Sequence, residues 1–454
     1  MTPELPSASL AESVQFNQTV IVPNAIQGLF RRRPRAVGVA TRLDVDGRAV
    51  RLMEGMRRNH GPGPVWVRVM TDRALVMLEV DDVRRVLEGS PHPFAPDPEA
   101  KRKGMAHFQP DALTLSRGDL WEDRRRFTEA VLETPRAAHR LADGWVAVAR
   151  EETATLLEEV ARDDGGRLGY DSFLRAFRRS VRRIVLGDTA REDEVVSDLL
   201  ATLMSEANGL PSQRSERFEP FMERIDAYVV RAEPGSLVSL FSDVRSSPDT
   251  RVEGQVPHWL FAMQDTLSIN ALRALAAIVS HPEQRAQVEG ELEAAGGLPE
   301  TASGVAGLSY MRACMQEAMR LWPTTPLLSR ETLVDLSWNG SVVPAGTQIL
   351  IVNTFHHRDR DRHDFADRFA PEAWIDGDAS SEWAFNHFSH GPQGCPGTNI
   401  ALLVGATVLA ELLLRGEPRL LEPSLDPDRP LPHMLNVFGI RVATKAPELQ
   451  TAAA

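Results

Sequence analysis

Apolar residues recur along most of this chain every three to four positions, the spacing that places side chains on one face of an α-helix. The pattern is clearest over residues 120–231, 256–279 and 309–321. Turn-forming sequences interrupt the first stretch at Asp163–Gly166 and Gly209–Pro211, so it is expected to form several helices. These stretches predict a chain that is mainly helical.

Shorter runs rich in β-branched residues predict a few strands. Val65–Val69 and Ala74–Leu78 flank a polar turn and are expected to pair with each other. Further strand-like runs occupy Thr332–Trp338 and Gln348–Val352, and a hairpin is expected around Asn436–Val442. The predicted fold class is therefore mainly α with small β-sheets.

The chain has 454 residues and a mass of 50.2 kDa, which is long enough for several domains. No long Gly/Ser tract, internal repeat or low-complexity block divides it, so residues 1–454 are expected to form a single large domain. Residues 1–45 show no clear period and are expected to be an irregular N-terminal segment. Arg51–Asn59 is expected to form the first helix.

The net charge of −12 gives little electrostatic support for nucleic-acid binding, because that requires an excess of basic residues. Two basic clusters, Lys101–Lys103 and Arg124–Arg126, stand out against this acidic background. The simplest interpretation is that both are solvated surface, and the second interpretation is that they dock an acidic partner.

Two cysteines, Cys314 and Cys395, are too few for a disulfide framework and favour a reducing cytoplasm. The first 18 residues lack the charged and then apolar pattern of a signal peptide. No run of residues approaches the roughly 20 apolar positions that a membrane span requires. We therefore expect a cytoplasmic protein that does not span a membrane.

Cys395 lies in a glycine-rich turn directly before the apolar run Ile400–Leu414. Gly391 and Gly397 on either side of it allow the backbone to fold tightly around the sulfur. The N-terminus of a helix in the following run would stabilise an anionic sulfur. The turn therefore predicts a thiolate held against a metal cofactor, and the alternative is a buried, inert thiol.

Three further residue pairs carry weaker signals. Glu317 and Arg320 are three residues apart on a predicted helix, where they can form an ion pair. The side chains of Asp265 and Thr266, inside the predicted helix 256–279, could deliver protons, and a threonine can distort a helix by bonding back to a carbonyl. Trp121 and Arg125 form a W-x-x-x-R pattern, which alone would be a buried tryptophan beside a solvated arginine.

These four patterns occur in the order W-x-x-x-R, D-T, E-x-x-R and F-x-x-G-x-x-x-C-x-G, and together they resemble the cytochrome P450 family of haem-thiolate monooxygenases. The absence of an N-terminal anchor makes the chain similar to the soluble bacterial type. The resemblance implies that haem b is the cofactor and that Cys395 is the axial ligand of its iron. It also implies that Phe388, Gly391 and Gly397 belong to the haem-binding loop.

The resemblance assigns roles to the other motifs as well. Asp265 and Thr266 would be the catalytic pair that supplies protons to iron-bound dioxygen. Glu317 and Arg320 would form a structural ion pair beneath the haem loop. The remaining cofactor-binding residues, which would hold the haem propionates, are Trp121, Arg125 and Arg330.

Four positions depart from the family pattern. Met263 stands where a small residue is usual, and Gln393 stands where His or Arg often faces a propionate. Pro396 cannot donate a hydrogen bond to the sulfur, which predicts a low-potential haem. Ala373 stands where a third, basic partner of the Glu317 pair is common, and Arg368 is a speculative substitute.

The implied activity is insertion of one oxygen atom from O₂ into a largely apolar small molecule. The electrons would come from a ferredoxin or flavodoxin with its reductase, docking on the face that carries Arg124 and Arg126. One alternative is a peroxide-driven peroxygenase or decarboxylase, a branch in which Cys-Pro ligation occurs but the acid–alcohol pair is absent. Another is a non-catalytic haem sensor or electron carrier. The residues do not name the substrate.

Overall fold

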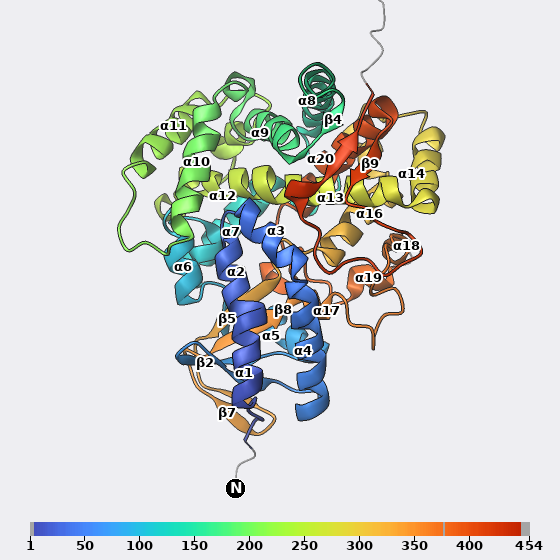
Figure 1. Ribbon diagram of the computed structural model, residues 1–454. Helices are drawn as coiled ribbons and strands as arrows, with labels where there is room; N and C mark the ends of the chain where they lie inside the picture. Colours follow the sequence, from blue (N-terminus) through green and yellow to red (C-terminus); the bar gives the residue numbers. More distant parts are fainter. Residues whose placement is uncertain (1–3, 376, 446–454) are drawn as a thin grey trace, which may run out of the picture.

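The computed structural model describes residues 4–375 and 377–445 of the chain, arranged as a large helical body beside a smaller part rich in β-strands (Figure 1). The helices of the larger body belong mainly to the middle of the chain. They are α6 Glu99–Met105, α7 Gly118–Leu132, α8 Ala142–Asp163, α9 Tyr170–Leu186, α10 Glu194–Ala207, α11 Phe218–Arg231, α12 Val256–Phe261, α13 Leu267–Ser280, α14 Pro282–Ala294, α15 Ala302–Ala306, α16 Ser309–Leu321 and α20 Thr398–Gly416. The mainly helical fold class is as predicted.

The N-terminal segment is helical, so the expectation of an irregular segment over residues 1–45 was wrong. α1 Leu10–Phe16, a π-helical turn at Asn17–Ile21 and α2 Val22–Gln27 follow one another without a break. α3 Pro34–Arg42, α4 Val45–His60 and α5 Val80–Glu88 follow. Apolar residues lie on both the buried and the exposed sides of α1 and α2, which hides the helical period from a search for one apolar face.

The main sheet has five strands in the order β1-β2-β8-β5-β3. β1 Val65–Val69 pairs with β2 Asp72–Val76 in antiparallel fashion, as predicted, and β2 runs parallel to β8 Gln348–Val352. β5 Leu327–Thr332 is antiparallel to β8 and to the two-residue β3 Phe94–Ala95. This sheet therefore joins the N-terminal strands to segments more than 250 residues later in the chain.

Two strand predictions were wrong because strand pairing depends on distant partners. The run Thr332–Trp338 is divided between β5 and β6 Leu336–Trp338, and β6 pairs with β7 Ser341–Val343 in a separate sheet. No hairpin forms at 436–442. Instead β10 Arg441–Ala443 lies between β4 Arg167–Leu168 and β9 Arg419–Glu422.

The centre of the helical body is formed by α13, α16 and α20, which pack against one another. α20 is the one helix in the described ranges that is long and apolar enough to cross a membrane, and 78% of its most apolar stretch is buried inside the protein. A helix that is apolar all round is expected at the centre of a large protein. This helix begins three residues after Cys395, so the cysteine loop rests on the core.

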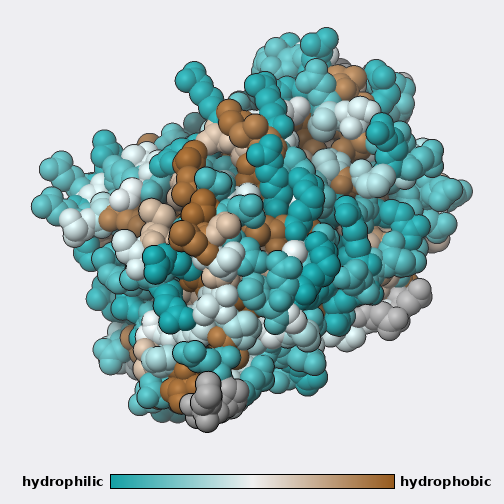
Figure 2. Space-filling view, turned by 60° about the horizontal axis from the view of Figure 1, so that its bottom comes forward, coloured by the Kyte–Doolittle hydropathy of each residue, from teal (hydrophilic) through white to brown (hydrophobic). Residues whose placement is uncertain are grey.

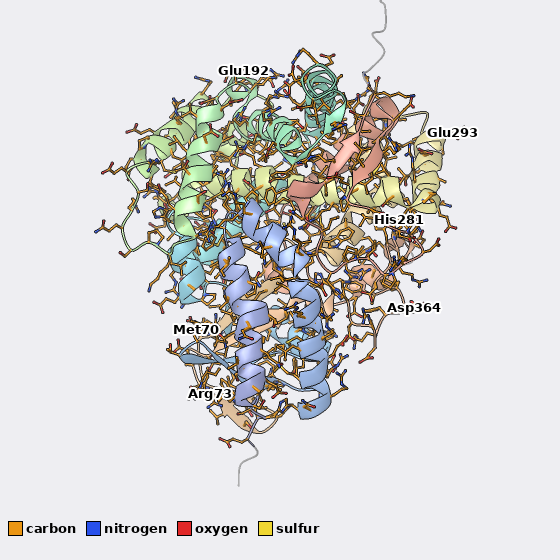
Figure 3. The ribbon with its side chains drawn as sticks, in the orientation of Figure 1. Met70, Arg73, Glu192, His281, Glu293 and Asp364 are labelled. Carbon is orange, nitrogen blue, oxygen red and sulfur yellow. The ribbon has the colours of Figure 1, made fainter. Side chains whose placement is uncertain are left out.

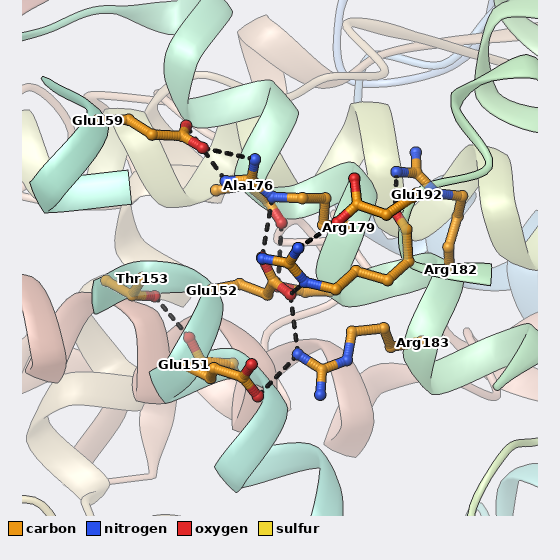
Figure 4. Close-up of polar contacts among 12 residues, drawn as sticks. Glu151, Glu152, Thr153, Glu159, Ala176, Arg179, Arg182, Arg183 and Glu192 are labelled. Atoms are coloured by element: carbon orange, nitrogen blue, oxygen red, sulfur yellow. Dashed lines mark hydrogen bonds and ion pairs between the residues drawn. The ribbon is translucent and has the colours of Figure 1, made fainter. Parts of the chain in front are cut away.

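An ion-pair network joins α8 to α9 (Figure 4). The side chain of Glu152 is fully buried, and its carboxylate pairs with Arg179, Arg183 and Arg191 at N–O distances of 2.8, 2.8 and 2.6 Å. Arg179 also pairs with Glu159. Since a buried carboxylate is costly without partners, three guanidinium groups around it fix how α9 sits on α8.

Candidate functional site

The cysteine loop, the D-T motif and Arg125 of the W-x-x-x-R motif meet at one cavity of about 310 Å³. Phe388, Cys395 and Gly397 line it on the side of the cysteine loop. Ala262 and Thr266 line it from the π-helical turn that joins α12 and α13. The folding of the chain thus places the predicted thiolate and the predicted alcohol around the same space.

Backbone hydrogen bonds close the loop around Cys395. The N–H of Cys395 donates to the carbonyl of Phe388 at 2.8 Å, and Arg125 Nη1 donates to the carbonyl of Gly394 at 2.7 Å. Gly391 has φ +66°, and a Cβ there would lie 2.5 Å from the carbonyl oxygen of Leu87. Gly391 does not line the cavity. Its lack of a side chain instead allows the cysteine loop to pack closely against α5.

The surroundings of the Cys395 thiol act on its charge in opposite directions. Its side chain is exposed to the cavity, and its distance from bulk water raises its pKa, whereas the N–H of Gly397, the hydroxyl of Thr398 and the charge of Arg125 lower it. Pro396, between Cys395 and Gly397, contributes no N–H. Because a metal ion deprotonates a thiol that it binds, a metal on the cavity side would complete the stabilisation of a thiolate.

The helix across the cavity from Cys395 is distorted at the predicted place. Residues Ala262–Thr266 form a π-helical turn in which the N–H of Leu267 donates to the carbonyl of Ala262. Within the described residues the Thr266 hydroxyl makes no hydrogen bond back to a carbonyl, so the wide turn itself produces the distortion. π-Turns inside α-helices are frequent at functional sites.

Asp265 and Thr266 lie differently with respect to the cavity. Thr266 lines it together with Met263, whereas Asp265 does not. Burial raises the pKa of Asp265, and the positive charges of Arg178 and Arg31 act against that rise. The pair therefore offers a hydroxyl to the cavity and, in the protein beyond it, a carboxyl whose pKa is raised.

Glu317 and Arg320 form a fully buried bidentate ion pair. Arg320 Nη2 donates to Glu317 Oε1 at 2.6 Å and Arg320 Nε donates to Glu317 Oε2 at 2.7 Å. Arg320 also donates to main-chain carbonyls on the segment that precedes the cysteine loop: those of His357, Phe365, Ala366 and Arg368. The pair thus ties α16 to that segment.

The third partner of this pair is Trp374, not Arg368. The indole Nε1 of Trp374 donates to Glu317 Oε2 at 2.9 Å, next to the N–H of Ala370, which donates to Glu317 Oε1 at 2.9 Å. The Arg368 side chain is 61% exposed and pairs with Asp364 at the edge of the molecule (Figure 3). An indole therefore replaces the basic group that the family pattern led us to expect.

Several buried polar groups near the cavity have no protein partner. Trp121 Nε1 and Gln393 Nε2 accept or donate no hydrogen bond within the described residues, and Gln393 lines the cavity. Arg330, on β5, is 3% exposed and forms no ion pair with a described carboxylate. It donates to Ser90 Oγ at 3.0 Å and to the Ser329 carbonyl at 2.9 Å, and burial lowers its pKa to about 10.

Lys101 is a candidate residue that the sequence pattern missed. It is not part of a solvated face: its ammonium group donates to the Pro96 carbonyl and to Thr114 Oγ1, both at 2.8 Å, and Thr114 lines the cavity. Burial and the nearby charge of Arg330 lower the pKa of Lys101 to about 7. Only the fold separates it from the exposed Arg102 and Lys103, since all three share one basic run.

The predicted docking face also needs correction. Arg124 is 4% exposed and donates to Ser116 Oγ at 2.9 Å and to the Thr250 carbonyl at 3.2 Å, so it is not available to a partner. Arg126 is 65% exposed and pairs with Asp123. Of these two predicted docking residues only Arg126 lies on the surface.

Comparison with known proteins agrees with this geometry. The Cytochrome P450 family model matches residues 236–436, which include the π-turn, the buried ion pair and the cysteine loop. The solved structure of the cytochrome P450DA heme domain superposes with a TM-score of 0.70 at 16% identity, covering 87% of this chain and 92% of that one.

The chain matches the cytochrome P450 family over residues 236–436 and has the fold of a cytochrome P450 heme domain.

Relatives at the sequence level include cytochrome P450 4c3 of Drosophila melanogaster, which is 27% identical over 195 residues, covering 42% of this chain and 35% of that protein. Methyltetrahydroprotoberberine 14-monooxygenase of Papaver somniferum is 28% identical over 189 residues, covering 40% of this chain and 36% of that protein. These matches span little more than a third of the relatives' length. Cytochrome P450 81F2 of Arabidopsis thaliana is 25% identical over 339 residues, covering 66% of this chain and 68% of that protein.

The residues present fit the haem that the cytochrome P450 family implies. A thiol with an N–H and a hydroxyl beside it faces the cavity, which suits an iron ligand. Trp121 Nε1 and Gln393 Nε2 lack partners that a carboxylate would provide. Arg330 is buried and Lys101 is partly buried, and neither forms an ion pair with a described carboxylate, although the charge of Asp97 acts on Lys101. Together these groups form an incomplete set of donors around the cavity.

Replacing Trp374 with phenylalanine should destabilise this P450 fold, because Glu317 would lose a buried hydrogen bond. We expect the free energy of unfolding to fall by about 1–3 kcal/mol in urea denaturation. Trp383→Phe is the control, since the indole of Trp383 makes no hydrogen bond to a described residue. Equal losses in the two variants would contradict a role of Trp374 as third partner.

Proposed function

We propose that this protein is a haem-thiolate monooxygenase that inserts one oxygen atom from O₂ into a largely apolar small molecule. The observation that carries the proposal is the position of Cys395 and Thr266 around one cavity. Two relatives are named as monooxygenases, one of them cytochrome P450 monooxygenase buaD of Petromyces alliaceus. The proposal includes a cytoplasmic location and electrons from a separate ferredoxin or flavodoxin with its reductase.

Haem b, when bound, supplies the iron on which dioxygen is reduced and split. Cys395 would hold that iron through its sulfur, with the Gly397 N–H stabilising the negative charge. The Thr266 hydroxyl faces the same space and would position a proton there. The wide turn at Ala262–Thr266 leaves room for a water molecule beside it.

Asp265 would supply the proton that Thr266 passes on. Burial raises the pKa of its carboxyl, so it holds a proton at a higher pH than an exposed aspartate does. It lies outside the cavity wall, near the positive charges of Arg178 and Arg31. A carboxyl in this position can exchange protons with the protein exterior while the cavity excludes bulk water.

The cavity itself supports an apolar substrate. Leu113, Trp259, Met263, Leu267 and Leu328 line it. Polar side chains also reach it, and burial lowers the pKa of one of them, His258, to about 4, so that this ring is uncharged at neutral pH. Arg125 also lines the cavity, but its charge is paired with Glu129. A largely apolar wall with a few polar groups binds and orients an uncharged molecule.

Charge balance points in the same direction. Haem b carries two propionate carboxylates, and neither the buried Arg330 nor the partly buried Lys101 forms an ion pair with a described carboxylate, although the charge of Asp97 acts on Lys101. Pairing each cation with one propionate would neutralise both, as buried charges require. Lys101 would then supply the positive charge for a propionate, which the uncharged Gln393 cannot supply. No buried cation of this pair would remain for an anionic substrate.

The first test is the absorption spectrum of the haem-loaded protein after reduction with dithionite under carbon monoxide. We expect the strongly red-shifted Soret band of thiolate ligation, and Cys395→Ser should lose it. Cys314→Ser is the control, because Cys314 is fully buried in the core away from the cavity. A Soret band typical of a neutral ligand in the unchanged protein would remove the basis of the proposal.

Thr266→Ala should leave reduction of the iron unchanged but divert electrons to hydrogen peroxide. We expect the fraction of reducing equivalents recovered as product to fall by about 10-fold or more, within the usual effect of a positioned proton donor. Thr128→Ala is the control, since Thr128 lines the same cavity from α7. Efficient turnover by the unchanged protein with hydrogen peroxide alone would assign it to the peroxide-driven branch.

Lys101→Gln should weaken haem retention, measured as the rate of haem transfer to an excess of apomyoglobin. Loss of one buried charge-assisted bond is expected to speed transfer by about 10-fold or more. Lys103→Gln is the control on the same helix, because Lys103 is 59% exposed and pairs with Glu99. With haem dimethyl ester, which lacks the propionate charges, the two variants should release the group equally fast. A persistent difference with the ester would contradict a bond to propionate.

A further inference from the structure

The N-terminal helices expose apolar side chains in regular rows. On the continuous helical segment from α1 to α2, Leu10, Val14, Val22 and Ile26 are 72%, 47%, 39% and 55% exposed. Within each helix these residues are four positions apart, which places them on one face. Phe16 and Val20 of the same segment are buried on the opposite side. The segment is thus apolar toward the core and again apolar toward the solvent.

The exposed row continues beyond α2. Leu29 is 46% exposed, and on α3 Val39 and Leu43, again four residues apart, are 54% and 48% exposed. Met70, 66% exposed, lies beside the segment, because its N–H donates to Asn17 Oδ1 at 3.0 Å (Figure 3). Figure 2 shows apolar side chains gathered in a strip on this face. We call these eight residues, Leu10, Val14, Val22, Ile26, Leu29, Val39, Leu43 and Met70, the N-terminal apolar face.

This face is distinct from the rest of the described surface. Fifteen large apolar side chains are strongly exposed in the described ranges, and seven of them lie between residues 10 and 43. Single exposed apolar residues are normal on a soluble protein, but a cluster of them marks an interaction site. The concentration of exposed apolar side chains in one short segment therefore indicates that this face binds a partner.

The charge around the N-terminal apolar face is opposite to that of the whole protein. Residues 10–43 contain five arginines and one acidic residue, Glu12, in a chain whose net charge is −12. Arg33, Arg35 and Arg42 are exposed, and none of them pairs with a described carboxylate. An apolar row with unpaired cations beside it is complementary to a surface that is negatively charged and apolar below the charges.

We propose that the N-terminal apolar face rests on an anionic lipid bilayer. The apolar side chains would enter the boundary between head groups and acyl chains, and the arginines would contact lipid phosphates. Figure 1 shows α1, α2 and α3 on the outside of the molecule, and the side chains of the face are exposed there. This is peripheral contact and requires no membrane-spanning helix.

The position of the face connects it to the cavity. Phe30, between α2 and α3, packs against Phe108 with ring centroids 6.0 Å apart, and Phe108 packs against Phe261 at 5.7 Å. Arg32 donates to the carbonyl of Thr324 at 3.0 Å, and Thr324 lines the cavity. Lipid at this face would therefore lie beside the wall of a cavity suited to apolar molecules, although binding to lipid does not depend on the proposed enzymatic activity.

The test is co-flotation of the full-length protein with vesicles of equal parts phosphatidylcholine and phosphatidylglycerol, compared with vesicles of phosphatidylcholine alone. We expect binding to the anionic vesicles that weakens at high salt, since exposed charges are screened. Val22→Gln/Ile26→Gln and Arg35→Gln/Arg42→Gln should each lower the partition coefficient by about 10-fold or more.

Matched controls separate this face from general stickiness. Val195→Gln/Val230→Gln removes valines that are 47% and 85% exposed on α10 and α11, and Arg245→Gln/Arg429→Gln removes exposed arginines elsewhere. Both controls should bind like the unchanged protein, and unchanged urea midpoints would show that all variants fold.

Two results would overturn the proposal. One is the absence of binding to anionic vesicles, or binding that falls equally in the test and control variants. The other is a concentration-dependent dimer that is lost in Val22→Gln/Ile26→Gln without any lipid binding, which would assign the face to a second copy of the chain. Neither result bears on the spectrum under carbon monoxide, so this inference and the proposed function can fail separately.

Discussion

The buried ion pair between Glu317 and Arg320 is the contact on which the position of the cysteine loop depends. Arg320 binds four main-chain carbonyls of residues 357–368, and Glu317 binds the N–H of Ala370 and the indole of Trp374. An irregular segment has few ways to satisfy its polar backbone inside a protein, and here one helix provides them. The loop that carries Cys395 follows directly from this fixed segment and leads into α20.

The cavity beside that loop is surrounded by polar groups that the protein leaves unsatisfied. Trp121 Nε1 and Gln393 Nε2 lack partners among the described residues, and Arg330 and the partly buried Lys101 form no ion pair with a described carboxylate. Such groups cost free energy in an empty site, and that cost is removed when a group with matching acceptors binds. Together with the Cys395 thiol, these donors fit the haem that the cytochrome P450 family implies.

On the outer surface, the N-terminal helices likewise carry side chains that have no partner within the protein. α1, α2 and α3 place large apolar side chains toward the solvent and carry arginines that lack ion pairs, although the protein as a whole is acidic. The core needs only the inner side of these helices, through residues such as Phe16 and Val20. Their outer side is thus free to meet a lipid surface next to the cavity wall.

The sequence by itself determined the features that depend on local order along the chain. The helix Ser309–Leu321, the first strand pair and the cysteine turn follow from spacing, turn residues and motif order. The π-helical turn at Ala262–Thr266 interrupts a helix predicted to be continuous over 256–279. The tertiary structure decided what depends on distant partners. Trp374, not Arg368, is the third partner of the Glu317–Arg320 pair. Lys101 points inward although it belongs to a basic run, Arg124 is buried, and residues 10–27 are helical. Burial and contacts between segments that are distant in sequence set these outcomes, so the residues adjacent in sequence do not predict them.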